Sequence, residues 1–587
     1  MFKNFPGYKL LESIQKKKSH KRERKFPLNA IKLIFIVTIS LVLAMLPTEA
    51  FGIEGLTAVH QRIIALFVFA ALMWLTETLP SWVTSMVVVT VMLLTVSTSA
   101  FKSLRTESLT KTEAMQIACD RALDAETTAR NLVDSLAQIP AEKRDAEAFN
   151  NAVLKYNNAR IDTEKMNMLR ECSEATIAEA KKNDAEYKEK TFTPYVPFKD
   201  IMGCFANPTI MLFIGGFVLA IGLTKVKLDV ALARILLKPF GTRSEIVLLG
   251  FILVTAIFSA FVSNTATAAM MLAFLTPVLR SLPADGKGRI ALALAIPVGA
   301  NLGGMMTPIG TPPNMIALDY LTSIGQSISF VDWTIKMAPF VTLLLVLAWL
   351  LLRVLFPFKQ KNIKIEIEGD IKWDFKTWSV VAAFAITIFM WMFGTDLWNI
   401  DTNVVAMIPI AIFCATGILT RRDLEEINWS VLWMVAGGFA LGVALNYKVT
   451  DPETGNVLYQ SLSSIIVGSV PFDTFEPLVV MILAGLICFG FSNFISHSAA
   501  TSLLVPVLGV VAVGIGDKLD AFGGAQAMLV GIAIASSVSM ILPISTPPNA
   551  IAHSTGFIEQ KDMMKVGIII GLLGIVLGYG MLIFIGF

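Results

Sequence analysis

The chain has 587 residues, 55% of them hydrophobic and only 16% charged, and its mean hydropathy is +0.67. Because a soluble globular domain carries roughly 25% charged residues, this composition excludes an ordinary soluble protein. The net charge of +3 gives no reason to expect a nucleic-acid partner, and the five cysteines include no close pair with metal-ligand spacing.

Apolar runs of about 20 residues, the length that crosses a bilayer core of about 30 Å, recur along most of the chain. They lie near residues 30–48, 61–79, 82–98, 207–223, 290–310, 333–356, 378–394, 403–419, 430–446, 525–545 and 564–586. We therefore predict an all-α polytopic protein with about eleven spans, embedded in the lipid bilayer of the cell inner (plasma) membrane.

The first 26 residues form a basic tail. Seven cationic residues crowd its end: Lys16, Lys17, Lys18, Lys21, Arg22, Arg24 and Lys25. A secretory signal peptide also begins with basic residues before an apolar run, here with small residues near Ala50. Since this apolar run is long enough to span, we expect an uncleaved first helix, a cytoplasmic tail at 1–26 and three spans within 27–100.

Residues 101–199 break the apolar pattern. The segment is highly charged, and its apolar residues recur at helical spacing. We expect two helices near 108–138 and 141–187, folded as a hairpin outside the bilayer, with a partly disordered insert as the alternative. Starting from a cytoplasmic N-terminus, three spans place this insert outside the cytoplasm, where a disulfide between Cys119 and Cys172 could form.

Basic residues in short loops indicate the side of the membrane, because they favour the cytoplasm. Arg243 precedes the apolar region 245–282 and Arg280 ends it, so both of its ends are expected inside. The region is therefore predicted to be a re-entrant hairpin within a first repeat at 200–358, followed by a cytoplasmic loop at 359–376.

A similar apolar region lies later in the chain. Residues 475–514 carry the same polar interruption but lack the basic flanks. We place this second hairpin on the outer side, within a second repeat at 377–587.

Four short motifs occur in the same order in both parts. They are Gly215-Gly216-Phe217 and Gly437-Gly438-Phe439, Ser263-Asn264 and Ser492-Asn493, a proline thirteen residues past each Asn (Pro277 and Pro506), and Thr311-Pro312-Pro313-Asn314 and Thr546-Pro547-Pro548-Asn549. Since the flanking charges put one hairpin inside and the other outside, the two repeats are inverted. Inverted repeats are typical of secondary transporters, whose sites lie near the bilayer midplane between the repeats.

The Thr-Pro-Pro-Asn motifs mark places where a span stops and restarts, because proline lacks an N–H and fits best in the first turn of a helix. Carbonyl groups freed near Gly310 and Ser545 can coordinate a cation, and the restarting helices offer N–H donors and a positive dipole end to an anion. Ser and Asn at the hairpin tips cap helix starts and supply oxygens that suit sodium. The alternative is that these residues only cap breaks and join helices.

These motifs resemble those of the divalent anion–sodium symporter family, which includes dicarboxylate, citrate and sulfate carriers. The resemblance covers nearly the whole chain except the tail and the insert. It rests on Ser263-Asn264-Thr265, Ser492-Asn493, Phe205-Ala206-Asn207-Pro208-Thr209 and the two Thr-Pro-Pro-Asn motifs. It implies a homodimer with eleven spans and two re-entrant hairpins per protomer, in which a transport domain moves across the membrane as an elevator.

The resemblance also implies a site. Substrate would be bound by Ser263, Asn264, Thr265, Thr311, Pro312, Ser492, Asn493, Thr546 and Pro547. One sodium site would use Ser259, Ser263, Asn264 and Gly310, and a second would use Ser492, Asn493 and Ser545.

The second half departs from the family pattern. Phe494 and Cys488 stand where the family usually has an oxygen-bearing side chain. His497 lies one helical turn past Asn493, on the same helix face. A protonated imidazole there is a candidate for the charge that replaces a second sodium ion.

We therefore expect a secondary active transporter, not an enzyme, that is driven by sodium and carries a small anion such as succinate, malate, fumarate, citrate or sulfate. The alternatives are a sodium-independent carboxylate exchanger, a sulfate carrier, and a membrane sensor that uses the insert. Unused polar breaks within a membrane are costly, which argues against a sensor that has lost transport.

Overall fold

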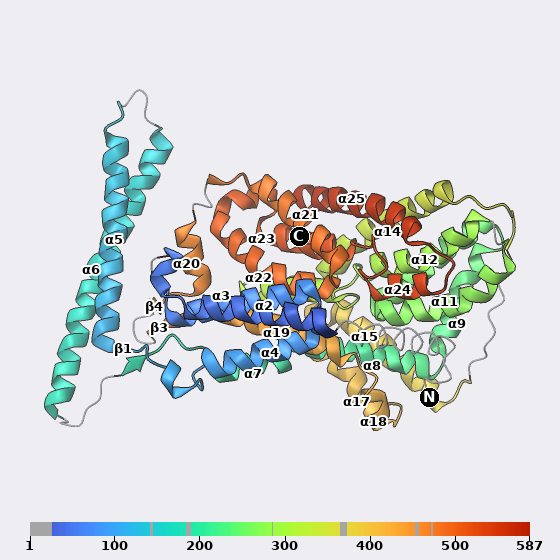
Figure 1. The fold of residues 1–587 in the computed structure, drawn as a ribbon, viewed down its shortest axis with the longest axis horizontal. Helices are drawn as coiled ribbons and strands as arrows, with labels where there is room; N and C mark the ends of the chain where they lie inside the picture. The colour runs from blue at the N-terminus through green and yellow to red at the C-terminus, as the bar shows by residue number, and fades with distance from the viewer. Residues whose placement is uncertain are drawn as a thin grey trace.

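The structure is a computed structural model. It describes residues 26–53, 55–140, 145–183, 190–283, 286–363, 372–451, 457–470 and 474–586. The basic cluster at residues 16–25 lies outside the described residues. Regular structure in the described part is almost entirely helical (Figure 1). Two short antiparallel sheets pair β1 (Leu109–Thr110) with β2 (Thr191–Phe192), and β3 (Val449–Thr450) with β4 (Val457–Tyr459).

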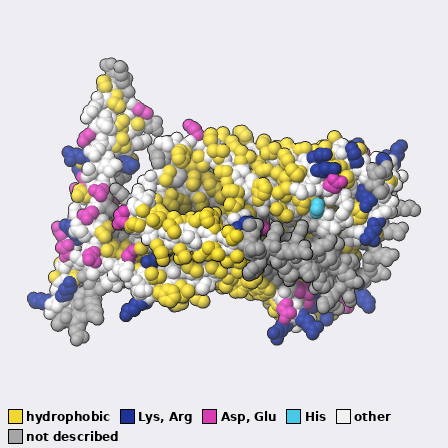
Figure 2. Space-filling model, in the orientation of Figure 1, with side chains coloured by type: hydrophobic (Ala, Val, Ile, Leu, Met, Phe, Trp, Pro, Cys, Tyr) yellow, Lys and Arg dark blue, Asp and Glu magenta, His cyan; other side chains and the backbone are white. Residues whose placement is uncertain are grey.

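Within the described residues, nine helices are long and apolar enough to cross a membrane by length and composition. They are α3 (Ala58–Thr76), α8 (Pro208–Lys225) with α7 (Phe198–Gly203), α10 (Ser244–Phe261), α14 (Phe330–Leu355), α15 (Phe375–Trp398), α19 (Trp429–Asn446), α21 (Pro477–Phe494), α22 (His497–Ile515) and α25 (Gln560–Phe584). Apolar side chains cover the middle of the molecule between two charged ends (Figure 2). The predicted all-α polytopic fold is confirmed.

Further apolar helices complete the membrane part. They include α2 (Phe26–Met45), α4 (Ser81–Thr95), α16 (Thr402–Val405), α17 (Met407–Ala415) and α23 (Gly524–Ser537). The apolar runs near 290–310 and 525–545 are not continuous spans. Each holds one helix that ends at an unwound segment, as the proline motifs predict.

The two halves follow one plan. The first half contains α10, α11 (Asn264–Ser281), α12 (Lys287–Gly303), α13 (Pro312–Ser323) and α14. The second half contains α21, α22, α23, α24 (Pro547–Ser554) and α25. Each half is thus a helical hairpin, an interrupted helix and a long helix. In both halves the first hairpin arm packs on the interrupted helix, and α13 and α14 contact α23 and α25 of the other half. We call these ten helices the paired-repeat unit.

The remaining membrane helices flank the paired-repeat unit. Helix α19 packs on α4 and α3, while α8 packs on α17, α16 and α15. We call α2–α4, α8, α15–α17 and α19 the flanking unit. The two units meet mainly where α19 contacts α22 and α13. Three short helices lie in the connections: α9 (Leu228–Leu237), α18 (Arg421–Leu424) and α20 (Leu462–Ser469).

The insert forms two long helices, α5 (Lys111–Ala137) and α6 (Ala146–Asn183), which pack side by side at one end of the molecule (Figure 1). Helix α5 begins with a capping box between Thr110 and Glu113, which stabilises its first turn. Over the described residues the insert is therefore helical, as expected, rather than partly disordered. Cys119 is buried, Cys172 is exposed and both are free, so the possible disulfide between them is not formed in this structure. The side of the membrane on which the insert lies stays a prediction.

Candidate functional site

Two unwound segments interrupt the paired-repeat unit. Helices α13 and α24 each restart at a proline, and the residue before it, Thr311 or Thr546, is extended. The first asparagine after each proline pair closes its loop. Asn314 Nδ2 donates to the carbonyls of Thr307 (2.8 Å) and Gly304 (3.1 Å). Asn549 Nδ2 donates to those of Met540 (2.9 Å) and Leu542 (3.1 Å). The Thr-Pro-Pro-Asn motifs therefore build two equivalent loops.

The first hairpin turns at Val262 and Ser263, and α11 begins at Asn264. Ser263 caps the helix by accepting a hydrogen bond from Ala266 N. Ser259 Oγ lies 2.6 Å from Asn264 Oδ1 and 2.7 Å from the Ala300 carbonyl oxygen. Three oxygen atoms thus lie close together at the start of α11, and two of them belong to the predicted residues Ser259 and Asn264.

The backbone of the first loop passes very close to this oxygen cluster. A methyl group at Gly304 would lie only 2.6 Å from Asn264 Oδ1, so a larger residue there would displace the Asn264 side chain. The first hairpin tip and the first loop are therefore in direct contact.

The second hairpin differs from the prediction. Helix α21 continues through Ser492 and Asn493 to Phe494, and α22 begins at His497 after the N-cap Ser496. The tip is therefore Ser496-His497-Ser498. It lies one helical turn after Ser492-Asn493, the pair that the sequence analysis placed at the tip. A helix begins where a side chain can cap its free N–H groups and the backbone can turn, and Ser496 meets both needs.

Ser492 and Asn493 are buried in the last turn of α21. Ser492 Oγ donates to Ser536 Oγ (3.1 Å). Asn493 Nδ2 donates to the Phe489 carbonyl, and Asn493 Oδ1 accepts from Ile541 N (2.8 Å). Asn493 therefore connects backbone groups, and its binding role stays a prediction. Counted from its tip, Ser492 corresponds to Ser259.

His497 takes the position that Asn264 holds in the first half. Its Nε2 lies 2.6 Å from the Ser539 carbonyl oxygen. Because a carbonyl oxygen can only accept, Nε2 is the donor of this bond. The second tip is thus joined to its loop by His497, which the sequence analysis named as a candidate charge in place of a second sodium ion.

One cavity of about 310 Å³ lies between the two tips and the two loops. The paired-repeat unit lines it with Phe261, Ser263, Asn264, Thr265, Asn301, Ile309, Gly310, Thr311, Pro312, Ser496, His497, Ser498, Ser545, Thr546, Pro547 and Pro548, and the flanking unit lines it with Ser81, Trp82, Phe213, Gly216, Phe217, Asn428, Ser430, Val431 and Met434. The residues predicted for the first tip and both loops meet here. Among the predicted site residues, Ser259, Ser492 and Asn493 are not in its lining.

The N-termini of four helices converge on this cavity, because α11, α13, α22 and α24 all begin at residues that line it. None of the described residues in its lining is Lys, Arg, Asp or Glu. The starts of α11 and α22 present backbone N–H groups, whereas α13 and α24 each begin with two prolines that have none, and all four helix starts carry a partial positive charge. The cavity therefore attracts an anion through backbone groups and hydroxyls rather than through a basic side chain.

Asn301 on α12 joins the two halves, and the sequence analysis missed it. Its Nδ2 donates to Asn549 Oδ1 (3.0 Å) and Thr546 Oγ1 (3.3 Å). Its Oδ1 has no hydrogen-bond partner among the described residues, although the side chain is 1% exposed. A buried polar residue before a helix break was the available signal, since such groups need partners.

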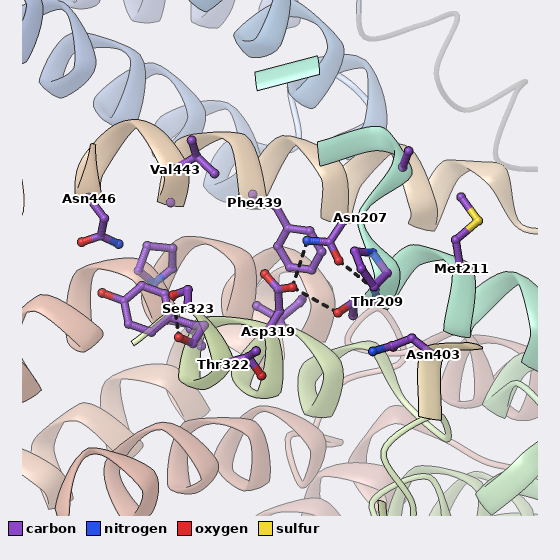
Figure 3. A pocket seen from close by; sticks show the side chains of 18 of the residues that line it. Asn207, Thr209, Met211, Asp319, Thr322, Ser323, Asn403, Phe439, Val443 and Asn446 are labelled. Carbon is purple, nitrogen blue, oxygen red and sulfur yellow. Dashed lines mark hydrogen bonds between the residues drawn. The ribbon is translucent and has the colours of Figure 1, made fainter. Parts of the chain in front are cut away.

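A second cavity, of about 1060 Å³, lies further along α19 between the same two units. The first cavity meets α19 at Ser430, Val431 and Met434, and the second meets it from Gly438 to Asn446. Figure 3 shows Asp319 in its wall, accepting hydrogen bonds from Asn207 Nδ2 (3.0 Å) and Thr209 Oγ1 (3.1 Å). This contact joins α13 to the start of α8.

Comparison with known proteins identifies the family of this chain. The family model described as "Citrate transporter" matches residues 191–531, which is more than half of the chain. The chain belongs to the citrate transporter family. The resemblance to divalent anion–sodium symporters is thereby confirmed, and this citrate transporter family member is a multi-pass membrane transporter rather than an enzyme.

Individual relatives match most of their own length. A "sodium-dependent dicarboxylate transporter SdcS" of Staphylococcus saprophyticus is 28% identical over 411 residues, 64% of this chain and 76% of the relative. An "uncharacterized transporter" of Haemophilus influenzae is 30% identical over 398 residues, 65% of this chain and 82% of the relative. The solved structure of the Alcanivorax borkumensis YdaH transporter covers 67% of this chain and 91% of its own at 13% identity, with a TM-score of 0.43.

Proposed function

We propose that this protein carries small di- or tricarboxylates across the membrane, driven by sodium. The substrate would lie in the cavity between Ser263-Asn264-Thr265 and Ser496-His497-Ser498, against the Thr311 and Thr546 loops. The observation that carries this proposal is the convergence of four helix N-termini on a cavity lined by no charged described residue. Two carboxylates of one molecule can each approach a separate pair of helix starts.

The size of the cavity favours a small metabolite. Ligand pockets range from about 300 to about 1,000 Å³, and this one is at the lower end at about 310 Å³. Trp82 and Phe217 supply apolar surface for a short carbon chain. Relatives named sodium-dependent dicarboxylate transporters support the same substrate class.

Sodium coupling is supported by the first half. Ser259 Oγ, Asn264 Oδ1 and the backbone near Gly304 and Gly310 bring oxygen atoms together beside the cavity. Hard cations prefer oxygen ligands. A sodium ion bound there would place positive charge next to the anion, so that each would favour binding of the other.

We further propose elevator movement in a homodimer. The paired-repeat unit holds both tips and both loops, so it can carry the site while the flanking unit stays fixed. Large apolar residues on α15 are exposed, among them Trp378 at 59%, Phe389 at 47% and Phe393 at 46%. The flanking unit thus offers an apolar face to lipid or to a second copy.

Uptake of labelled succinate, citrate and sulfate into proteoliposomes tests the proposal. We expect succinate or citrate to accumulate under an inward sodium gradient and not when potassium replaces sodium. Liposomes without protein are the control. Equal uptake with and without sodium would instead support the exchanger, which His497 favours because it puts a nitrogen where the first half has an oxygen. Absence of uptake of all three anions would refute the function.

A further inference from the structure

The two halves of the paired-repeat unit are not chemically equivalent behind their tips. We propose that only the first half binds a coupling sodium ion. In the second half, the hydrogen bond made by His497 takes the place of a second sodium site. This inference rests on the proposed function and makes its ion coupling specific. It predicts fewer sodium ions per anion than two symmetric sites would give.

The comparison between halves uses positions counted back from each tip. Ser263 and Ser496 are the two N-caps. One turn before them stand Ser259 and Ser492, and two turns before them stand Thr255 and Cys488. The residue after each N-cap is Asn264 in the first half and His497 in the second.

In the first half the groups facing the tip are oxygens. Ser259 Oγ lies within 2.7 Å of both Asn264 Oδ1 and the Ala300 carbonyl. The Asn264 side chain lies against Gly304, at the start of the unwound loop. A cation here would connect the tip of the hairpin to the loop before α13.

In the second half the same connection already exists without a cation. His497 Nε2 donates to the carbonyl of Ser539, which stands just after α23 ends. A nitrogen that carries a hydrogen cannot coordinate a metal ion. The bond therefore removes one ligand position and also uses one of the two lone pairs of the Ser539 carbonyl.

Other oxygens behind the second tip are also engaged. The His497 carbonyl accepts from Thr501 Oγ1 (2.9 Å) and from Ser536 Oγ (3.0 Å), which uses both of its lone pairs. Ser492 Oγ donates to Ser536 Oγ, and its other neighbour is the Cys488 sulfur at 3.8 Å. Thiols suit soft metals better than sodium.

Asn493 does not restore the missing oxygen. Its Oδ1 accepts from Ile541 N at 2.8 Å, and its Nδ2 donates to the Phe489 carbonyl. Turning the amide toward the tip would leave the Ile541 N–H without this hydrogen-bond partner, which is unfavourable for a buried donor. The second half thus joins its tip to its loop through a histidine nitrogen, whereas the corresponding groups of the first half, Ser259 Oγ and Asn264 Oδ1, are oxygens, which suit a cation.

The number of sodium ions bound by the purified wild-type protein tests the inference directly. Equilibrium binding of radioactive sodium in the presence of succinate should give one ion per protomer. Two ions per protomer would overturn the proposal, and this measurement needs no substituted protein. This measurement is independent of transport. A protein without uptake would refute the proposed function, but the number of sodium ions bound per protomer would be unchanged.

Two reciprocal substitutions sharpen the test. His497→Asn gives the second tip the first tip's residue and should raise the count to two ions per protomer, with a steeper dependence of uptake on sodium. Asn264→His should abolish sodium binding. Size-exclusion chromatography of both variants and of wild type checks that each protein is folded. A folded His497→Asn protein that still binds one ion would show that the histidine does not close the site.

Discussion

Asp319 on α13 accepts hydrogen bonds from two residues at the start of α8, Asn207 at 3.0 Å and Thr209 at 3.1 Å (Figure 3). Helix α13 belongs to the paired-repeat unit and α8 to the flanking unit. If the paired-repeat unit moves as an elevator, these bonds break during every cycle. The contact therefore stabilises the arrangement seen here relative to the other end of the cycle.

We expect Asp319→Ala to lower the Tm of the purified protein in this arrangement. A hydrogen bond to a charged group contributes about 1.5–3 kcal/mol, and two such bonds are lost. Asn403→Ala, in the wall of the same cavity, is the matched control and should leave the Tm nearly unchanged. Equal Tm values for Asp319→Ala and wild type would show that the contact does not stabilise this arrangement.

Asn264 and Asn493, which occupy equivalent places in the two sequence motifs, should respond differently to substitution. Asn264→Ala removes an oxygen from the cavity and should reduce sodium-dependent uptake at least tenfold while the protein remains folded. Asn493→Ala leaves the buried Ile541 N–H unpaired, so we expect it to destabilise the fold by about 1–3 kcal/mol with little change in the sodium concentration for half-maximal uptake. Uptake and Tm are measured on both variants. If Asn493→Ala instead lost sodium-dependent uptake and kept its Tm, Asn493 would be a binding residue.

A third prediction concerns the ion pair between Lys225 at the end of α8 and Asp423 on α18, whose Nζ–Oδ2 distance is 2.5 Å. Burial raises the pKa of Asp423, but hydrogen bonds from Lys225 and Thr420 outweigh burial and hold this pKa below its ordinary value of 3.8. A lowered folded pKa means that the stabilisation is present above the unfolded pKa and is lost as pH falls through the folded pKa.

We therefore expect Asp423→Asn to lower the Tm by the same few degrees at about pH 5 and about pH 8, because the carboxylate is ionised at both. Thermal unfolding of variant and wild type at the two pH values measures this. A difference that vanishes at about pH 5 would show that the folded pKa is not lowered.

The fourth prediction concerns the side of the insert. In a protein without native cysteines, a cysteine at the exposed Ser135 on α5 should react with an impermeant thiol reagent in intact spheroplasts, because the charge pattern places the insert outside. A cysteine at the exposed Arg422 on α18 should react only after lysis. Labelling of both positions only after lysis would refute the predicted sidedness.

Features that depend on local chemistry could be predicted from the amino-acid sequence. Runs of apolar residues gave the membrane helices, because backbone groups in lipid must be paired within a helix. Pro312 and Pro547 located the two interruptions, since proline cannot donate the hydrogen bond that a continuous helix needs. Ser263 correctly marked the first tip, where the capping residue and the polar motif coincide.

Features that depend on contacts between distant residues came from the tertiary structure alone. The letters Ser-Asn recur at Ser492-Asn493, but the packing of α21 against α23 keeps these residues helical and moves the second tip to Ser496. Asn301 and Asp319 became visible only because the fold brings them to Thr546 and Asn207, far away in the chain. Hydrogen bonds between distant segments follow from how helices pack, and no local pattern in the sequence records that geometry.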